Sequence, residues 1–224
     1  MSCLISFNLT GRMLIFMLIL ILFSFFSSEI QAQDTIRLEN PSLEDKPRCC
    51  MPPQGWGSLD FPGNTAADVQ PGGGFKVNRA AYHGSTYLGM VTRGDGTFET
   101  VYQQLSNPLL PNVCYQISIY LAKSLEYTSA TRSNPNDNID FLAPTIIQIL
   151  GGNSPDDPEL EILNASTPVD HHEWIEYVFE FIPSEDFSYI FFSAYFPEGI
   201  KYYTNGHILI DNLSDIIPCG DITD

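Results

Sequence analysis

The chain has 224 residues, of which 44% are hydrophobic and 12% aromatic, and its 27 acidic against 10 basic residues give a formal charge of −17. This charge excludes nucleic acid as a partner, because phosphate binding requires clustered cations that such a surface lacks. The aromatic content excludes a disordered chain, and the length fits one domain.

The first 32 residues predict a signal peptide. Arg12 precedes an apolar run from Met13 to Phe26, which is shorter than the roughly 20 residues of a membrane helix but suits the core of an export signal. We place cleavage after Ala32, a small residue, with an uncleaved N-terminal anchor as the alternative. Residues 33–224 then form a single exported domain without a stable membrane span, and we expect it in the periplasm, at the cell surface or outside the cell.

Short segments with alternating apolar residues follow, separated by turn signals. In residues 114–122 the side chains expected to face a core are Tyr115, Ile117, Ile119 and Leu121. In residues 174–181 the expected inward set is Ile175, Tyr177, Phe179 and Phe181, with Glu176 and Glu180 outward. Further strands are expected near residues 35–40, 86–92, 98–105, 144–150, 159–163, 188–196 and 207–213.

Two polar segments interrupt these strands, and we expect a long loop over residues 126–140 and a tight acidic turn over residues 151–158. No segment shows a convincing helical apolar period with caps at both ends. Eight or more strands in one domain predict an all-β, two-sheet antiparallel sandwich, because a single sheet would leave one apolar face in water.

Four cysteines remain once Cys3 leaves with the signal peptide. An even count in an exported protein favours disulfides, with three possible pairings. Zinc is the alternative, but Cys49 and Cys50 are adjacent and lack the spacer that lets two thiolates share one ion. Cys114 opens a strand and Cys219 follows the last one, so we predict that this pair is bonded. Cys49 and Cys50 would then form a vicinal pair or stay partly reduced.

Several segments occur in an order that resembles the galactose-binding-like jelly rolls, a group that includes many carbohydrate-binding modules. The segments are Asn40–Glu44, Gly55–Trp56, Gly63–Asp68, His83–Gly89, Tyr102–Leu105, Asn107–Leu110, Cys114–Ser124 and Ile210–Ser214. The order is most similar to a jelly-roll domain of envelope and gliding-motility-associated proteins in gliding bacteria, over nearly the whole mature chain. The resemblance implies a jelly-roll sandwich, whose members include sugar-binding, adhesive and structural domains.

Two acidic residues are candidate metal ligands. Asp211 alternates with Leu209 and Leu213, so it lies on a face that those leucines bury, where a carboxylate must be paired, hydrogen bonded or metal bound. In the modules that this chain resembles, the positions of Glu44 and Asp211 commonly help to hold a structural Ca²⁺, with backbone carbonyls as further ligands. We assign those carbonyls to Gly74–Arg79. The alternative is that Asp211 caps a turn and Glu44 is solvated.

Two other polar segments are weaker metal candidates. Residues 134–140 are rich in oxygen ligands but lack the central glycine and distant glutamate of an EF-hand, so we expect a solvated loop rather than a second calcium site. His171, His172 and Glu173 follow one another, and adjacent side chains of an extended segment point in opposite directions. We therefore expect an exposed loop here and no metal.

Aromatic residues in or near loops are the better functional candidates, because sugar rings stack on aromatic faces. The candidates are Trp56, Tyr82, Tyr87, Trp174, Tyr195, Tyr202 and Tyr203. The alternative for any one of them is core packing. Tyr202 and Tyr203 are the most suggestive, since consecutive residues of an extended chain cannot both face one core.

Catalysis is not expected. A glycosidase needs two carboxylates about 5–10 Å apart, whereas Glu176 and Glu180 are roughly 13 Å apart along one strand. The sequence also lacks a Gly-x-Ser-x-Gly nucleophile elbow. We therefore predict an exported, non-catalytic module that binds a polysaccharide or cell-surface glycan. A structural envelope component without a small ligand and a jelly-roll glycoside hydrolase are the alternatives.

Overall fold

The computed structural model describes residues 35–59, 66–131, 135–156 and 159–220. This part of the chain contains strands and no helix. The strands are β1 (Gly57–Ser58), β2 (Asp68–Gln70), β3 (Tyr87–Thr92), β4 (Thr100–Leu109), β5 (Tyr115–Lys123), β6 (Thr128–Ala130), β7 (Asn138–Asp140), β8 (Ile146–Gly152), β9 (Glu161–Ala165), β10 (Ile175–Phe181), β11 (Phe187–Tyr195), β12 (Gly206–Asp211) and β13 (Ile217–Pro218). The prediction of an all-β antiparallel sandwich is confirmed.

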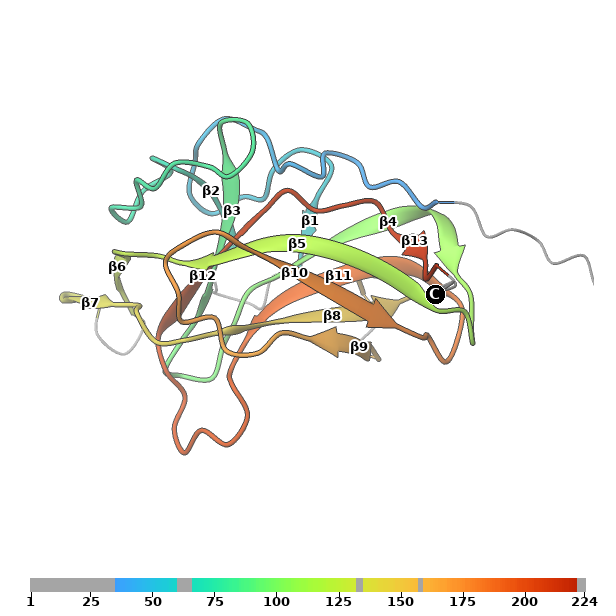
Figure 1. Ribbon diagram of the computed structural model, residues 1–224. Coiled ribbons are helices and arrows are strands. Elements are labelled where there is room, and N and C mark those ends of the chain that lie inside the picture. Colours follow the sequence, from blue (N-terminus) through green and yellow to red (C-terminus); the bar gives the residue numbers. More distant parts are fainter. Residues whose placement is uncertain (1–34, 60–65, 132–134, 157–158, 221–224) are drawn as a thin grey trace, which may run out of the picture. The chain divides into compact units, whose positions relative to one another are not determined.

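The strands form two main sheets and a small hairpin (Figure 1). One sheet has the order β1-β4-β11-β8-β9. The other has the order β10-β5-β12-β3-β2, with β13 paired to β5. All of these neighbouring strands are antiparallel. Strands that follow one another in the sequence often belong to different sheets, as β4 and β5 or β11 and β12 do, so the chain crosses repeatedly between the two layers.

The core lies between the inner faces of the two sheets. Ile117 and Ile119 of β5 meet Ile190 and Phe192 of β11 in one apolar cluster, and each is at most 1% exposed. Full burial of such a side chain stabilises the fold by about 1.5–3 kcal/mol. The inward face predicted for residues 114–122 is confirmed, because Tyr115 and Leu121 are also fully buried.

Three expectations about local structure were wrong. Ile175, expected inside, is 44% exposed, because it is the first residue of β10 at the edge of its sheet. The segment near 35–40 contributes only a single bridge, between Ile36 and Ile216. The loop expected over residues 126–140 contains the β6–β7 hairpin, whose polar composition hides it from a hydrophobicity pattern.

A second, smaller apolar cluster lies on the outer face of the six-stranded sheet. Its buried members are Val77, Tyr87, Val91, Ala122, Tyr127, Phe141 and Leu209. Several of them come from the segments around residues 72–82 and 125–143, which therefore cover β3 and β12 from outside. The outward residues of β10 remain open, since Glu176, Val178 and Glu180 are all exposed.

In the part of the chain that the structure describes, no helix has the length and the apolar character needed to cross a membrane. The predicted signal peptide, residues 1–32, lies outside the described residues.

The described residues contain two disulfides. Cys114 and Cys219 are joined with their sulfur atoms 1.99 Å apart, and the backbone N–H of Cys219 also donates to the carbonyl of Cys114. Cys49 and Cys50 form a vicinal disulfide. The first bond fixes β13 to the start of β5, whereas the second closes no loop of the chain.

His207 is a buried polar group of the outer cluster. It is fully buried on β12 with its ring 4.2 Å from the ring of Tyr127. Neither ring nitrogen has a hydrogen-bond partner among the described residues. Burial lowers the pKa of His207 from 6.5 to about 3, so the folded protein keeps this imidazole neutral.

The first prediction concerns His207→Phe. Between about pH 6.5 and pH 3 the unfolded chain binds a proton at His207 and the folded protein does not, so this residue costs stability as the pH falls. Burial raises the pKa of Asp68 and Asp211 to about 6, so these two carboxyls add stability as the pH falls. They do so equally in the wild type and in the variant, and the difference between the two proteins therefore reports His207. We expect the thermal midpoint of the wild type to fall more steeply on acidification than that of the variant. Equal slopes would contradict the assignment, and His172→Phe controls for the imidazole-to-phenyl change.

The second prediction concerns the cross-link. Cys114 and Cys219 are 105 residues apart, and a loop of that size is worth somewhat under 5 kcal/mol in the chain-entropy model. We expect the Cys114→Ser, Cys219→Ser double variant to lose stability of that order in urea unfolding. The Cys49→Ser, Cys50→Ser control should lose much less, because adjacent residues close no loop. Non-reducing peptide mapping that links Cys219 to Cys49 or Cys50 would refute the pairing.

Candidate functional site

Two carboxylates hold successive parts of the loop before β3. Asp211 Oδ2 accepts the backbone N–H groups of Tyr82 and His83 at 2.8 and 3.0 Å. Glu44 Oε1 accepts those of Ser85 and Thr86 at 2.9 and 3.2 Å. We call this arrangement of Glu44, Asp211 and residues 82–86 the clasp.

The clasp depends on a glycine at its centre. Gly84 has a φ of +64°, and a Cβ on it would collide with the Glu44 carboxylate. Only glycine adopts this conformation without steric cost and leaves room for the carboxylate. The close approach of loop and carboxylate is therefore built into the backbone.

Asp211 is fully buried, as its alternation with leucines predicts. Burial raises the pKa of its carboxyl to about 6, the nearby Glu44 adds to the rise, and the three backbone N–H donors from His83, Tyr82 and Asn212 oppose it. Neither clasp carboxylate forms an ion pair with a lysine or arginine of the described segments. The segment predicted to supply carbonyl ligands, Gly74–Arg79, is not the one that the two acids hold, because their hydrogen bonds go to residues 82–86.

The clasp carries an exposed aromatic pair. The Tyr82 ring stacks on the Tyr120 ring with centroids 3.6 Å apart and planes 15° from parallel. Tyr82 is 46% exposed, and Tyr120 lies on the outward face of β5 between Ile119 and Leu121, which face the core. We call Tyr82 and Tyr120 the tyrosine shelf. The alternation places Tyr120 on the outward face, but the sequence analysis did not include it among the ligand-binding candidates, although an aromatic residue on the polar side of a strand is a usable signal.

Two other predicted ligand-binding residues lie near this loop, but both are packed against neighbouring residues. Tyr87 is fully buried, and Trp174 packs against it with ring centroids 5.3 Å apart. Trp174 is half-buried, and its indole N–H donates to the carbonyl of Ala80 at 3.0 Å while Arg79 lies over the ring. The expectation that Tyr87 is an exposed ring was wrong, because the segments over the outer sheet face enclose it.

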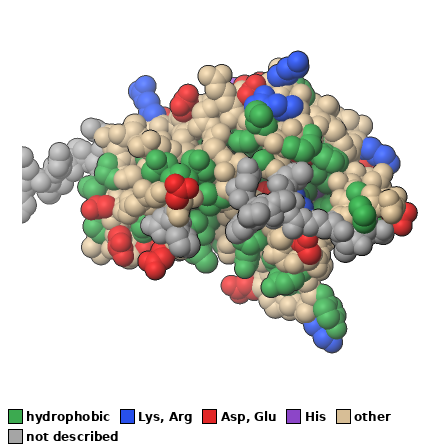
Figure 2. Space-filling model, turned by 180° about the vertical axis from the view of Figure 1, so that it is seen from behind, with side chains coloured by type: hydrophobic (Ala, Val, Ile, Leu, Met, Phe, Trp, Pro, Cys, Tyr) green, Lys and Arg blue, Asp and Glu red, His purple; other side chains and the backbone are tan. Residues whose placement is uncertain are grey.

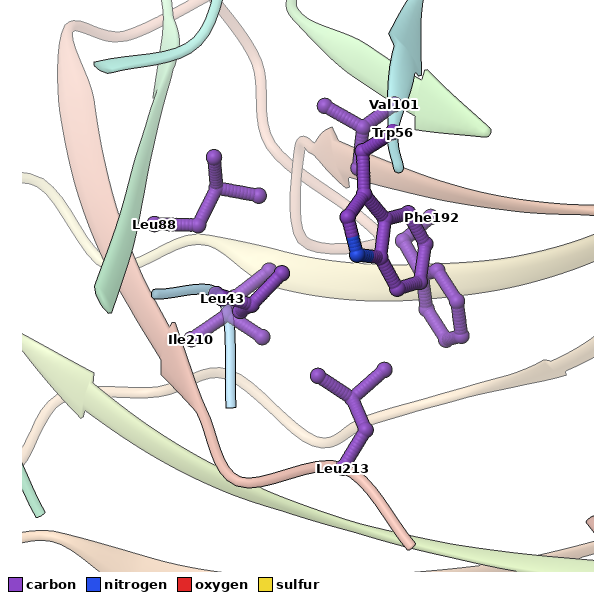
Figure 3. Close-up of a pocket in the computed structure, with 7 residues that line it drawn as sticks. All are labelled: Leu43, Trp56, Leu88, Val101, Phe192, Ile210 and Leu213. Carbon is purple, nitrogen blue, oxygen red and sulfur yellow. The ribbon is translucent and has the colours of Figure 1, made fainter. Parts of the chain in front are cut away.

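Trp56 is also a core residue, contrary to the expectation of an exposed ring. It is 7% exposed, and its ring meets Phe192 edge-on at 5.8 Å. Figure 3 shows its indole among the apolar side chains between the sheets. The gap that they enclose is too small for a water molecule, so it holds no ligand. The indole N–H donates to the carbonyl of Asn40 at 3.2 Å, which lets the loop bury this side chain.

An open groove lies on the outer face of the five-stranded sheet, beside the loop that joins β11 to β12. Its volume is about 330 Å³. The residues that line it are Ile146, Gln148, Ile162, Ala165, Tyr195, Phe196, Pro197, Glu198, Ile200 and Tyr203. We call this set the aromatic groove.

Three rings form one wall of the aromatic groove. Tyr195 meets Phe196 at 5.5 Å between centroids, and Phe196 meets Tyr203 at 4.7 Å. Tyr203 is 58% exposed and rests against Gly96, where a Cβ would lie 2.9 Å from its ring. The β3–β4 turn therefore supports the ring from behind while its other side faces solvent.

Tyr202, the neighbour of Tyr203, does not line the groove. It is 72% exposed, and the Lys201 ammonium lies 5.3 Å from its ring centroid. The β11–β12 loop projects from the sandwich at the bottom of Figure 1, and the tip of the projection carries hydrophobic and basic side chains in Figure 2. The two consecutive tyrosines thus face different surroundings, as their spacing predicts.

The remaining metal candidates have local partners. His171 is hydrogen bonded with the Glu173 carbonyl and the Tyr177 hydroxyl, and His172 with the carbonyl of Lys123. Among the residues described, three possible ligand atoms come within 4.8 Å of one another only at Cys49, Cys50 and Asp68. Both sulfurs there are in the vicinal disulfide, so no thiolates are available to bind zinc.

No protein-family model and no curated protein matches the chain. Solved structures that share its fold include a cyclase from Fischerella sp. TAU, with 14% identity, a TM-score of 0.51 and coverage of 84% of this chain and 98% of that one. The K3 cleaved adhesin domain of Lys-gingipain from Porphyromonas gingivalis W83 is 10% identical, with 74% and 91% covered and a TM-score of 0.45. The CBM22-1 xylan-binding domain of Xyn10C from Paenibacillus barcinonensis is 16% identical, with 74% and 86% covered and a TM-score of 0.41.

The likeness to the cyclase shows a shared β-sandwich fold. At such low identity the shared architecture carries no activity from one protein to another.

Proposed function

We propose that this protein is an exported, non-catalytic module that binds a neutral or cationic polysaccharide in the aromatic groove. The observation that carries the proposal is the wall formed by Tyr195, Phe196 and Tyr203 beside two polar groups, Gln148 and Glu198. Ligand sites commonly combine apolar and aromatic walls with a few polar groups that set orientation. Here Tyr203, the most exposed of the three rings, would stack on the apolar face of a sugar with Tyr195 and the buried Phe196 beside and beneath it, and the amide and carboxylate would bond hydroxyls.

Charge supports this choice of ligand. Among the described residues that line the groove, Glu198 is the one with an acidic or basic side chain, and the whole chain carries a formal charge of −17. Acidic glycans, nucleic acid and anionic lipid headgroups are repelled by such a surface. A neutral or amino-substituted sugar meets no such penalty.

The positions of the acidic residues favour binding over hydrolysis. Glu176 and Glu180 both lie outward on β10 and neither lines the groove. Glu198 is therefore the one carboxylate among the described residues that line the groove, whereas glycosidases typically use two across the scissile bond. Export and a place in the cell envelope, as in the gliding-motility-associated proteins that the sequence resembles, are part of the same proposal.

Calcium at the clasp is a second part of the proposal. Hard oxygen ligands are what Ca²⁺ prefers, and Glu44 and Asp211 bring two carboxylates to one loop without a basic partner among the described residues. Backbone N–H groups bond Asp211 at both oxygens, Oδ2 from Tyr82 and His83 and Oδ1 from Asn212. Glu44 Oε1 accepts the N–H groups of Ser85 and Thr86, and Oε2 accepts only the Thr86 hydroxyl at 3.5 Å. An ion would therefore contact the remaining lone pairs of these oxygens, with Glu44 Oε2 the least occupied. Bound Ca²⁺ would offset the repulsion between the two acids.

The third prediction tests calcium by its effect on stability. If the clasp binds the ion only in the folded state, chelation should lower the thermal midpoint and added Ca²⁺ should restore it. The gain is about 2.7 kcal/mol at a hundredfold excess over Kd. Asp211→Asn should lose this response, whereas Glu180→Gln, an exposed carboxylate elsewhere, should keep it. An unchanged melt in excess chelator, with no metal found by elemental analysis, would mean that the N–H donors alone satisfy the carboxylates.

The fourth prediction tests the groove. We expect Kd on the order of 1 mM to 1 μM for the bound polysaccharide, measured by glycan array, insoluble-polysaccharide pull-down and calorimetry. Tyr203→Ala should cost roughly 1–3 kcal/mol of binding, as loss of other ring-stacking contacts does. Affinity should depend little on salt, since no ion pair is involved.

Tyr202→Ala is the matched control, because it removes the neighbouring tyrosine from outside the groove. It should keep the affinity of the wild type, and circular dichroism should show both variants folded. If Tyr202→Ala loses binding and Tyr203→Ala does not, the groove is the wrong surface. If no glycan binds the folded protein, the structural or adhesive alternative takes its place.

A further inference from the structure

We propose that the tyrosine shelf is a second saccharide-binding surface, which takes the flat face of a pyranose ring in a neutral polysaccharide, so that the module binds two chains at once. The proposal shares its ligand class with the proposed function and adds a separate site on the other side of the sandwich. It is built from Tyr82 and Tyr120 and is independent of the aromatic groove.

The shelf offers one open aromatic face. The rings of Tyr82 and Tyr120 are 3.6 Å apart and almost parallel, so Tyr120 covers the inner face of the Tyr82 ring. The 46% of Tyr82 that is exposed therefore belongs to its outer face and edges. An aromatic face exposed to water is unfavourable in free energy, and covering it with an apolar surface is favourable. The apolar face of a pyranose ring matches it in size and shape.

The shelf is held in place before any ligand arrives. Tyr120 is fixed by pairing of β5 with its two neighbours, opposite Glu176 on one side and Asp211 on the other. The backbone N–H of Tyr82 is held by Asp211 in the clasp. Ordering a free side chain on binding costs about 0.5–1.5 kcal/mol, and a ring that is already ordered avoids most of that cost. The clasp thus positions a binding residue, which gives the buried carboxylate a role beyond stability.

Polar groups around the shelf suit a neutral, hydroxyl-rich ligand. The phenol hydroxyls of Tyr82 and Tyr120 can each donate and accept hydrogen bonds. Glu176, directly opposite Tyr120 on β10, is exposed, and its carboxylate can accept hydrogen bonds from sugar hydroxyls. The carboxylate and the overall charge of −17 disfavour an acidic polymer, because like charges repel.

The two surfaces lie on opposite faces of the sandwich. Tyr120 points outward from the six-stranded sheet, because its neighbours Ile119 and Leu121 are in the core. Gln148 of the groove points outward from the five-stranded sheet, because its neighbours Ile147 and Ile149 are in the same core. One sugar chain lying flat on either face cannot cover both. Two linked sites raise apparent affinity for a polymer without new contacts and allow it to be cross-linked.

The fifth prediction separates the two sites by calorimetry with xylohexaose, cellohexaose and mannohexaose, and by light scattering with the matching soluble polysaccharides. We expect two hexasaccharides per wild-type chain. Tyr82→Ala should weaken the shelf site at least about fivefold and leave groove binding intact, whereas Tyr203→Ala should do the reverse. Each variant should abolish polysaccharide cross-linking. Tyr82→Phe, which keeps the ring, should retain two sites, and so should Val178→Ser on the same sheet face.

The outcomes distinguish this proposal from the proposed function. If Tyr203→Ala removes all binding and Tyr82→Ala changes nothing, the shelf is overturned and the groove stands. If Tyr82→Ala removes all binding and Tyr203→Ala changes nothing, the shelf stands as a site and both the groove and bivalence are overturned. Failure of all three hexasaccharides and their polymers to bind the folded protein overturns both proposals.

Discussion

The burial of one apolar face by each sheet is the constraint on which the rest of the molecule depends. Side chains alternate strictly along a strand, so β5 commits Ile117 and Ile119 to the core and leaves Ser118 and Tyr120 outside. The core requires only shape and apolarity from the inward set. The outward set is free to vary, and both proposed binding surfaces are built from it.

One residue departs from this division and connects the two sets. Asp211 stands at the end of β12 in full burial, where an uncompensated charge would cost several kcal/mol. It is compensated by backbone donors of a distant segment, which brings the loop of Tyr82 down onto the outer face of β5. A requirement of the interior thereby determines the position of a ring at the surface.

The parts of the fold that follow from local pattern were predictable, and those that depend on long-range covering were not. The inward residues of β5 follow from period-two alternation alone. The burial of Tyr87 depends on separate segments that fold over the outer sheet face, including Tyr127 and Phe141, and no local pattern contains that information. Trp56 was misread for a similar reason, because a loop residue can return to the core when its polar edge finds an acceptor.

The candidate site was predictable in composition and less so in arrangement. Acidic and aromatic residue types pointed correctly to Asp211 as a buried group and to Tyr203 as an exposed ring. Which rings share a surface depends on strand order, since the groove combines β8 and β11 with the loop after β11, and the shelf combines β5 with the loop before β3. Strand order cannot be read from spacing.

The Cys114–Cys219 bond also has a mechanical consequence. It joins the start of β5, a strand inside its sheet, to the end of β13. When the chain is stretched from its ends, tension passes through this covalent bridge and bypasses the segment between the two cysteines, which are 105 residues apart. This segment would span roughly 350 Å if fully extended, at about 3.3–3.6 Å per residue, and the disulfide prevents the pull from extending it. All three rings of the groove and the Tyr120 ring of the shelf lie in that segment, so much of both surfaces is shielded from a pull that extends the N-terminal part of the domain.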